Sequence, residues 1–429
     1  MTPRVRVVVL NHNGGELTLE CLRRLTRTDW PADALELVLV DNASTDQVVG
    51  TCRRELPSVR IVESPVNRGF AGGCNLALRN LAVVDHVSLV NSDVLVDPGW
   101  LAPLVEALDA DPALGAASPK IVLAAPMTEI GIRVGRTRRP GRGDDRDLGI
   151  RVRGVRVDGV DQSRLARFPR GFWGPEPVDG DGVPAQWSSG DATLLVPAPR
   201  DAQHVELLLD AAVPTDADLV AGAHHARHRV TAEPAWCRVE LRGVERFDVV
   251  NNAGSVLGAD GYGADRGYLE PDRGQYDTEE DVFAWCGGAV LLRAGYLRDV
   301  GLFDERLFLY YEDLELSWRG RERGWRYRYV PSSVVRHVHT ASTVQSSRLA
   351  DHFNERNRLL VLTRHGDAGG IARALARYAV VTASYARRDI ASPLLRGEPP
   401  RWEPVRRRVR ALAGYARLAP AMLRDRAGT

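Results

Sequence analysis

Four short apolar runs near the N-terminus are separated by segments with helical spacing, and this alternation limits the fold more than any other feature. The runs cover residues 5–10, 35–40, 59–62 and 87–90. Continuous β-branched runs are typical of buried parallel strands. Strands that alternate with helices predict a parallel sheet covered on both faces. Such sheets bind ligands at the carboxyl ends of their strands.

Polar residues follow three of these runs at that edge of the predicted sheet. Asn11 follows the first run, Asp41 and Asn42 end the second, and Asn91 and Asp93 end the fourth. Mg²⁺ and Mn²⁺ prefer oxygen ligands, and Mg²⁺ takes one or two carboxylates. Asp93 is therefore a candidate ligand for a cation on a leaving pyrophosphate, and Asp41 for a contact with a base or ribose. The alternative for both is a turn or helix cap.

A glycine-rich connection, residues 67–75, leads into the helix after the third run. Such loops bring backbone N–H groups close to a phosphate. Asn67 and Gly69 are the candidate donor-binding residues here. The loop matches neither the Walker nor the dinucleotide fingerprint, so on its own it identifies no ligand.

A second acidic pair, Glu312 and Asp313, lies far downstream, just before the helical spacing of Leu314 and Trp318. A carboxylate near the anomeric carbon of a sugar donor can remove the proton of an acceptor hydroxyl. The alternative is an acidic helix start favoured by the helix dipole. The Trp318 ring suits either stacking on a sugar or packing in the core. Arg319 faces either a pyrophosphate or solvent.

Two further motifs complete the set of candidate residues. Gly287 and Gly288 precede an apolar run, where small residues either admit an acceptor or allow tight strand packing. His337 follows a strand-like run, and His339 lies two residues later. A neutral imidazole completes a metal site or binds phosphate; a structural role is the alternative for either histidine.

The pattern divides the chain into four segments. Residues 1–149 and 246–345 carry the motifs above, as a nucleotide-binding and an acceptor part. Residues 150–245 contain short β runs separated by Pro, Gly and Asp, which predicts an inserted β-sandwich-like module. Two G-x-G-x-D-R stretches, 141–146 and 261–266, flank it; they are either a chance similarity or one loop that the insert split or duplicated.

The fourth segment, 346–429, is predicted to be helical and basic, with 17 arginines against seven acidic residues. It either contacts an anionic membrane surface or forms a solvated cap. The whole chain of 429 residues has a net charge of +1, which gives no case for nucleic acid. No uncharged apolar run approaches the roughly 20 residues that span a bilayer.

The cellular location is inferred from the N-terminus and the cysteines. The chain starts directly with a strand-like run, so we expect no signal peptide. Its five cysteines form no CxxC pair, which argues against a disulfide framework or a structural zinc site. We expect a cytoplasmic protein, or one bound peripherally to the inner face of the cell membrane.

In their order, these motifs resemble family 2 glycosyltransferases. Residues 7–11, 40–46, 67–75 and 91–93 resemble the nucleotide-binding half of that family. Residues 286–289, 301–305, 311–319 and 335–337 resemble its acceptor half. The branch most resembled is that of bacterial rhamnosyltransferase-like enzymes that build cell-surface polysaccharide. The resemblance covers roughly residues 4–130 and 245–365.

The resemblance implies a GT-A nucleotide-diphospho-sugar transferase fold, a Rossmann-like mixed sheet, with Mn²⁺ or Mg²⁺ as cofactor. It implies inverting transfer from a dTDP-rhamnose-like donor or a UDP-sugar to a hydroxyl of a glycan or lipid-linked acceptor. Asp313 would be the base. Asp93 would bind the metal, with His337 more important because Asn91 replaces the first acid of the family's DxD triplet. The implied donor-binding residues are Asn11, Asp41, Asn42, Asn67, Gly69, Asn91 and Arg319, and the acceptor-binding residues are Gly287, Gly288, Glu312 and Trp318.

Two other classes of protein remain as alternatives. A carbohydrate-binding or scaffolding protein with a degenerate transferase domain would show neither donor hydrolysis nor transfer. A nucleotidyltransferase would share the α/β nucleotide site but should carry a basic glycine-rich signature near the N-terminus. Residues 11–15 lack that basic residue.

Overall fold

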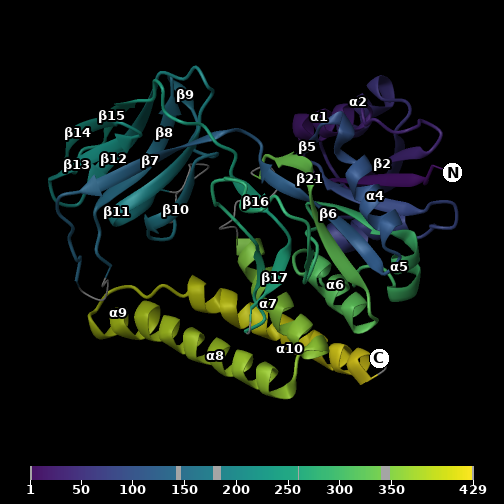
Figure 1. The fold of residues 1–429 in the computed structure, drawn as a ribbon. Coiled ribbons are helices and arrows are strands. Elements are labelled where there is room, and N and C mark those ends of the chain that lie inside the picture. Colours follow the sequence, from purple (N-terminus) through teal and green to yellow (C-terminus); the bar gives the residue numbers. More distant parts are fainter. Residues whose placement is uncertain (1, 142–145, 177–184, 259, 340–347, 428–429) are drawn as a thin grey trace. The chain divides into compact units, whose positions relative to one another are not determined.

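The computed structural model describes residues 2–141, 146–176, 185–258, 260–339 and 348–427. They form two compact units (Figure 1). One unit comprises residues 1–124, 250–268 and 273–429, and the other 125–249 and 269–272. The helices after residue 346 therefore belong to the same unit as the N-terminal sheet. The mixed α/β sheet, the extra β module and the C-terminal helices expected from the sequence are all present.

The first unit is built on a ten-stranded mixed sheet with the order β19-β21-β6-β20-β4-β1-β2-β3. Strands β3, β2, β1 and β4 are parallel, as the apolar runs predict, whereas β20 lies antiparallel between β4 and β6. Two short strands pair at its margin, β16 with β6 and β5 with β21. The strands are β1 (Val5–Asn11), β2 (Leu35–Asn42), β3 (Arg60–Ser64), β4 (His86–Asn91), β5 (Val94–Val96), β6 (Leu114–Leu123), β16 (Val250–Asn252), β19 (Glu280–Val282), β20 (Ala289–Arg293) and β21 (Arg326–His337).

Helices cover both faces of this sheet and bury one apolar cluster on each. Leu22, Cys52 and Leu104 place α1, α2 and α4 in one cluster. Leu78 and Leu316 place α3 and α6 in the other, together with α5. The helices are α1 (Gly15–Leu25), α2 (Val48–Glu55), α3 (Gly69–Leu78), α4 (Ala102–Ala110), α5 (Ala294–Val300) and α6 (Glu312–Glu322), with a 3₁₀ turn at Pro98–Trp100 and a hairpin of β17 (Ser255–Leu257) and β18 (Gly263–Asp265).

The second unit is a nine-stranded sheet folded around its own apolar cluster. It begins at residue 125, not at the 150 expected from the sequence, because β7 pairs with β11 and β13. Residues 142–145, part of the first G-x-G-x-D-R stretch, lie outside the described residues. The strands are β7 (Met127–Val134), β8 (Ile150–Val157), β9 (Val160–Asp161), β10 (Arg167–Phe172), β11 (Gln186–Pro197), β12 (His204–Ala211), β13 (Thr215–Ala221), β14 (His224–Val230) and β15 (Ala235–Glu240).

Four helices close the first unit: α7 (Arg348–His365), α8 (Ala368–Ala386), α9 (Ser392–Leu395) and α10 (Glu403–Ala427), with a π turn at Arg387–Ala391. Leu360 of α7 and Tyr415 and Met422 of α10 share a fourth apolar cluster. Leu307, from the loop before α6, joins the same cluster, so these helices are packed onto the sheet unit. In the part of the chain that the structure describes, no helix is long and apolar enough to cross a membrane.

Candidate functional site

Asp93 and His337 meet at the end of β4, although the sequence separates them widely. The short strand β5 follows Asp93 and pairs antiparallel with the end of β21, with His337 opposite Val94. His337 Nε2 lies 3.0 Å from Asp93 Oδ1, and its Nδ1 lies 2.8 Å from Asn251 Oδ1. Both side chains are buried. His339 packs against the edge of the His337 ring, with centroids 5.1 Å apart.

The surroundings of Asp93 favour the ionised form of its side chain. Burial alone raises the pKa of its carboxyl group, but the hydrogen bond and the electrostatic interaction with His337 outweigh this and hold the pKa below its ordinary value. A buried carboxylate beside an imidazole offers two side chains of the kinds that can ligate a divalent cation. Among the described residues, no group of three or more His, Cys, Asp or Glu could hold a metal. A two-ligand set fits Mg²⁺ or Mn²⁺ shared with substrate phosphates.

Asp313 lies beside the end of the same strand, held by the glycine pair. Gly287 N donates to Asp313 Oδ2 at 2.9 Å, and Leu314 N donates to Oδ1 at 2.7 Å. Asn91 N donates to Gly288 O at 2.9 Å, which joins the strand end to the glycine pair. Burial raises the pKa of Asp313, while the two N–H donors oppose the rise. A carboxylate with a raised pKa and a fixed orientation suits a general base.

Asp265, which the sequence analysis does not include among its site residues, lies within electrostatic reach of both Asp313 and His337. Asn252 Nδ2 donates to its Oδ1 at 2.6 Å. Crowding by protein atoms, together with the charge of Asp313, raises the pKa of Asp265 to about 6, although the residue as a whole is exposed. The only sequence signal was its place in the second G-x-G-x-D-R stretch.

Asn11 and Asp41 are brought together because β1 and β2 pair in parallel and the two residues are register partners. Asn11 Nδ2 donates to Asp41 Oδ1 at 3.2 Å and to Ser44 Oγ at 2.9 Å. Ser44 N donates to Asp41 Oδ2 at 3.3 Å. The contact with Ser44 N is of the helix-cap or turn kind, so the cap interpretation accounts for part of this carboxylate's bonding.

A second polar network holds the glycine-rich loop. Asn42 Nδ2 donates to Asn67 Oδ1 at 3.1 Å and to Gly69 O at 3.0 Å. Gly69 has φ +68°, and a Cβ there would collide with the carbonyl of Phe308. Glycine is therefore required twice over, by backbone conformation and by close approach. The loop is positioned by these bonds against the segment that leads to Asp313.

Glu312 is buried next to Asp313 at the start of α6. Burial, and then the charge of Asp313, raise its pKa well above the ordinary value. Its Oε2 has no hydrogen-bond partner among the described residues. An oxygen of this kind suits a hydroxyl group of a bound ligand.

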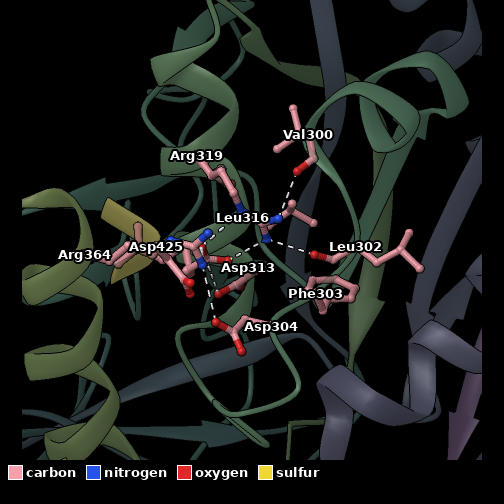
Figure 2. A network of polar contacts seen from close by, with 12 residues as sticks. Val300, Leu302, Phe303, Asp304, Asp313, Leu316, Arg319, Arg364 and Asp425 are labelled. Carbon is pink, nitrogen blue, oxygen red and sulfur yellow. Dashed lines mark hydrogen bonds and ion pairs between the residues drawn. The ribbon is translucent and has the colours of Figure 1, made fainter. Parts of the chain in front are cut away.

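Arg319 lies on α6 in surroundings other than those expected, whereas Trp318 has the core contacts that were one of its two interpretations. The Arg319 guanidinium donates to Glu315 and to the carbonyl oxygens of Val300 and Leu302, as Figure 2 shows for the two carbonyls. These bonds hold α6 in place, which differs from the expected contact with a donor pyrophosphate. The Trp318 ring stacks on His365, with centroids 5.4 Å apart, and packs against the fourth apolar cluster, so it has core contacts rather than an open sugar platform.

Buried ion pairs extend from Arg319 to the C-terminal helices. Glu315 also binds Arg364 at 2.7 Å and His365 at 3.3 Å, both from α7. Burial opposes ionisation of Glu315, but the charges of Arg319 and Arg364 and the His365 hydrogen bond lower its pKa to about 2. Arg364 also contacts Asp304 at 3.3 Å (Figure 2).

Asn357 of α7 braces the loop that leads into α6. Its Nδ2 donates to the carbonyl oxygens of Leu307, Leu309 and Tyr310 at 2.8, 2.9 and 2.7 Å. In this loop Phe308, Tyr310 and Tyr311 have φ of +65°, +67° and +70°, values that side-chain-bearing residues rarely adopt. Such conformations persist where the surroundings hold them. A C-terminal helix therefore holds the backbone immediately before Glu312.

A comparison with protein-family models matches residues 6–124 to Glycosyl transferase family 2. This match covers less than a third of the chain. It contains four of the expected motif regions, including Asp41 and Asp93. The mixed sheet also contains strands beyond residue 124; the β module is inserted after β6, and the C-terminal helices follow β21.

Curated relatives of this chain include the N-acetylglucosaminyl-diphospho-decaprenol L-rhamnosyltransferases of Mycobacterium tuberculosis, strains CDC 1551 / Oshkosh and ATCC 25618 / H37Rv. Each is 39% identical over 79 residues, which is 18% of this chain. The match spans 26% of the length of each relative.

Two solved glycosyltransferases also show similarity to this chain. GalNAc-T7 with UDP, GalNAc and Mn²⁺ has a TM-score of 0.47 at 13% identity, covering 85% of this chain and 48% of that one. The mannosyltransferase PcManGT of Pyrobaculum calidifontis with GDP-Man and Mn²⁺ has a TM-score of 0.42 at 17% identity, covering 100% and 80%.

Proposed function

We propose that this chain is an inverting glycosyltransferase that moves a sugar from a nucleotide-diphosphate donor to a hydroxyl of a glycan or lipid-linked acceptor. The observation that carries the proposal is that the end of β4 leads to Asp93 on one side and is bonded to the glycine pair next to Asp313 on the other. Asp93 lies there beside His337, and Asn91 N is bonded to Gly288 O, next to the Gly287 N–H that orients Asp313.

The donor occupies the carboxyl ends of β1, β2 and β4 in this proposal. Asp41 and Asn11 contact the nucleoside, and the loop held by Asn42 and Asn67 turns backbone N–H groups toward the diphosphate. Asp93 and His337 hold the cation. When bound, Mn²⁺ or Mg²⁺ supplies positive charge that stabilises the leaving diphosphate.

Asp313 is the general base of the transfer step. Its carboxylate accepts the proton of the acceptor hydroxyl while that oxygen forms a bond to the anomeric carbon. The bond between the anomeric carbon and the diphosphate oxygen breaks, and the electron pair leaves with the diphosphate. The N–H groups of Gly287 and Leu314 keep the carboxylate oriented, and Glu312 Oε2 accepts a second acceptor hydroxyl.

Rhamnose on a lipid-linked N-acetylglucosamine acceptor is the first combination to test. Its support is the 39% identity to relatives named as rhamnosyltransferases on such a lipid. dTDP-rhamnose and UDP-sugars should be screened by thermal shift with and without Mn²⁺, because a bound donor stabilises the folded state. Transfer is then measured with a polyprenyl-diphosphate N-acetylglucosamine acceptor. Absence of donor binding, hydrolysis and transfer throughout would leave the carbohydrate-binding alternative.

A further inference from the structure

The exposed surface of α10 carries two stripes of residues that run along the helix, one basic and one apolar. The basic stripe consists of Arg406, Arg410, Arg417 and Arg424, all exposed. Their spacing of four and seven residues places them along one side of a helix with 3.6 residues per turn. None of the four forms an ion pair with a carboxylate in the described part of the chain, although the first unit is rich in such pairs.

Neighbouring arginines of the same run point the other way. Arg407 binds Asp351 at 2.7 Å, and Arg408 lies over the Tyr378 ring at 4.0 Å while contacting Glu355. The structure thus divides the arginine run 406–410 into an inward pair that fastens α10 to α7 and α8, and an outward pair with no internal partner.

The apolar stripe lies beside the basic one. Val409, Leu412 and Leu423 are 53%, 39% and 51% exposed, and at about 100° per residue they lie on the flank of α10 between the basic stripe and the inward-packed Tyr415 and Met422. Trp402, 47% exposed, continues this stripe, because its carbonyl accepts from Arg406 N in the helical pattern. The helix is therefore apolar on its inner side, as packing requires, and also along one exposed flank, where packing does not require it.

We propose that this outer face of α10, defined as the two stripes together, docks on an anionic lipid surface. Arginines beside exposed Trp and Leu are the pattern of helices that lie in a membrane interface. Unpaired arginines complement anionic headgroups, and the apolar stripe gives area to bury that an electrostatic contact with nucleic acid does not use. The proposal deepens the proposed function, because a lipid-linked acceptor lies in such a surface.

The test uses the full chain and vesicles of phosphatidylcholine with or without phosphatidylglycerol. One variant carries Arg406→Gln, Arg410→Gln, Arg417→Gln and Arg424→Gln. A charge-matched control carries Arg27→Gln, Arg53→Gln, Arg54→Gln and Arg60→Gln, all exposed and remote from α10 in sequence. A third variant carries Val409→Ser, Leu412→Ser and Leu423→Ser. Thermal melting verifies that each variant is folded.

We expect the parent chain to co-sediment with anionic vesicles and the charge-matched control to bind nearly as well. The arginine variant should partition at least about tenfold more weakly, since each arginine near the surface contributes roughly a fivefold factor. The serine variant should also bind more weakly. Salt at about 1 M, where the screening length falls to about 3 Å, should weaken the parent toward the arginine variant.

Equal binding by the outer-face variants and the control would overturn the proposal, as would absence of vesicle binding by the parent. Concentration-dependent dimers in sedimentation velocity that disappear in the serine variant would also overturn it, because the face would then bind a second copy. Donor thermal shifts and hydrolysis in solution test the proposed function separately. An inactive chain that still binds vesicles through α10 contradicts the transferase proposal and leaves this one standing.

Discussion

Asp313 is the residue whose chemistry is most sharply defined by its surroundings. Two backbone N–H groups orient its carboxylate, one at each oxygen, so an asparagine would keep the shape and one of the two bonds but could not accept a proton. We therefore expect Asp313→Asn to lower turnover by roughly 10²–10⁴-fold with little change in donor affinity. Asp299→Asn, at an exposed position of α5, is the control. Loss of donor affinity with turnover intact at saturation would make Asp313 a binding residue.

The same residue predicts a pH dependence. A base must be unprotonated to accept a proton, and burial raises the pKa of Asp313 above the ordinary 3.8. Activity should therefore fall as the pH is lowered through this raised pKa, at a higher pH than an ordinary aspartate would give. A kcat/KM profile against pH measures it, and an acid limb at or below the ordinary value would contradict the assignment.

Asp93→Ala tests the cation site. The substitution removes one carboxylate at a strand end, so the fold should survive while Mn²⁺-dependent stabilisation by the donor is lost. Asp97→Ala, an exposed neighbour, serves as the control in the same thermal-shift titration. If the Mn²⁺ response and activity of Asp93→Ala match those of the control, the metal is held elsewhere.

At the scale of elements, the strands were predictable and some side-chain partners were not. The four apolar runs correspond to β1, β2, β3 and β4 within one or two residues, because continuous β-branched runs serve buried parallel strands. The polar residues after them collect at one edge for the same reason. Arg319, by contrast, was expected at a phosphate, and nothing local in the sequence shows that two carbonyls and Glu315 surround it.

Asp265 was missed for a related reason. It lies on a short hairpin after a long insert, and its neighbours Asp313 and His337 come from α6 and β21. Periodicity and spacing report on neighbours along the chain. This cluster instead combines residues of β18, α6 and β21, which the fold brings together. The same holds for Asn251, which fixes the His337 ring.

Helix α6 is anchored by Glu315, and this anchor should be sensitive to acid. The folded pKa of about 2 lies below the ordinary 4.5, so the folded state binds fewer protons than the unfolded one. The stabilisation is complete above about pH 4.5 and is lost as the pH falls toward 2. Glu315→Gln should remove it at neutral pH, at a cost on the order of 3 kcal/mol for breaking a buried pair.

The measurement is the free energy of unfolding against pH for three chains. Glu322→Gln, on the same helix with a side chain 38% exposed, should keep the acid sensitivity of the parent. Glu315→Gln should be less stable and less dependent on pH between about 4.5 and 2. Identical pH profiles for the Glu315 and Glu322 variants would contradict the anchoring role.

At the scale of the whole molecule, the insert is expected to fold by itself. It has its own apolar cluster, and its two ends are joined by reciprocal backbone bonds between Met127 and Phe247 of 2.8 and 3.0 Å. Residues 125–249 expressed alone should show β-rich circular dichroism and one cooperative thermal transition. A chain with no cooperative transition would contradict this.

Deletion of the insert tests whether the first unit folds and binds donor without it. Val250 pairs with Val122, so a short turn can join the ends that removal of residues 125–249 leaves. We expect this shortened chain to retain the donor thermal shift and to lose only contacts that the insert makes with a glycan or partner protein. The boundary at residue 125 was not predictable because β7 continues directly from the run that forms β6.

Because Asn357 holds the loop before α6, we expect catalysis to need the C-terminal helix α7 as well as the residues of the site. A version ended at residue 339, after the last expected motif, would keep Asp41, Asp93, Asp313 and His337. It would lose the side chain that holds Leu307, Leu309 and Tyr310, and the left-handed backbone at Tyr311 could relax and carry Asp313 away from Gly287. An apparently complete active site would then bind donor and transfer nothing, so shortened versions are poor stand-ins for the full chain.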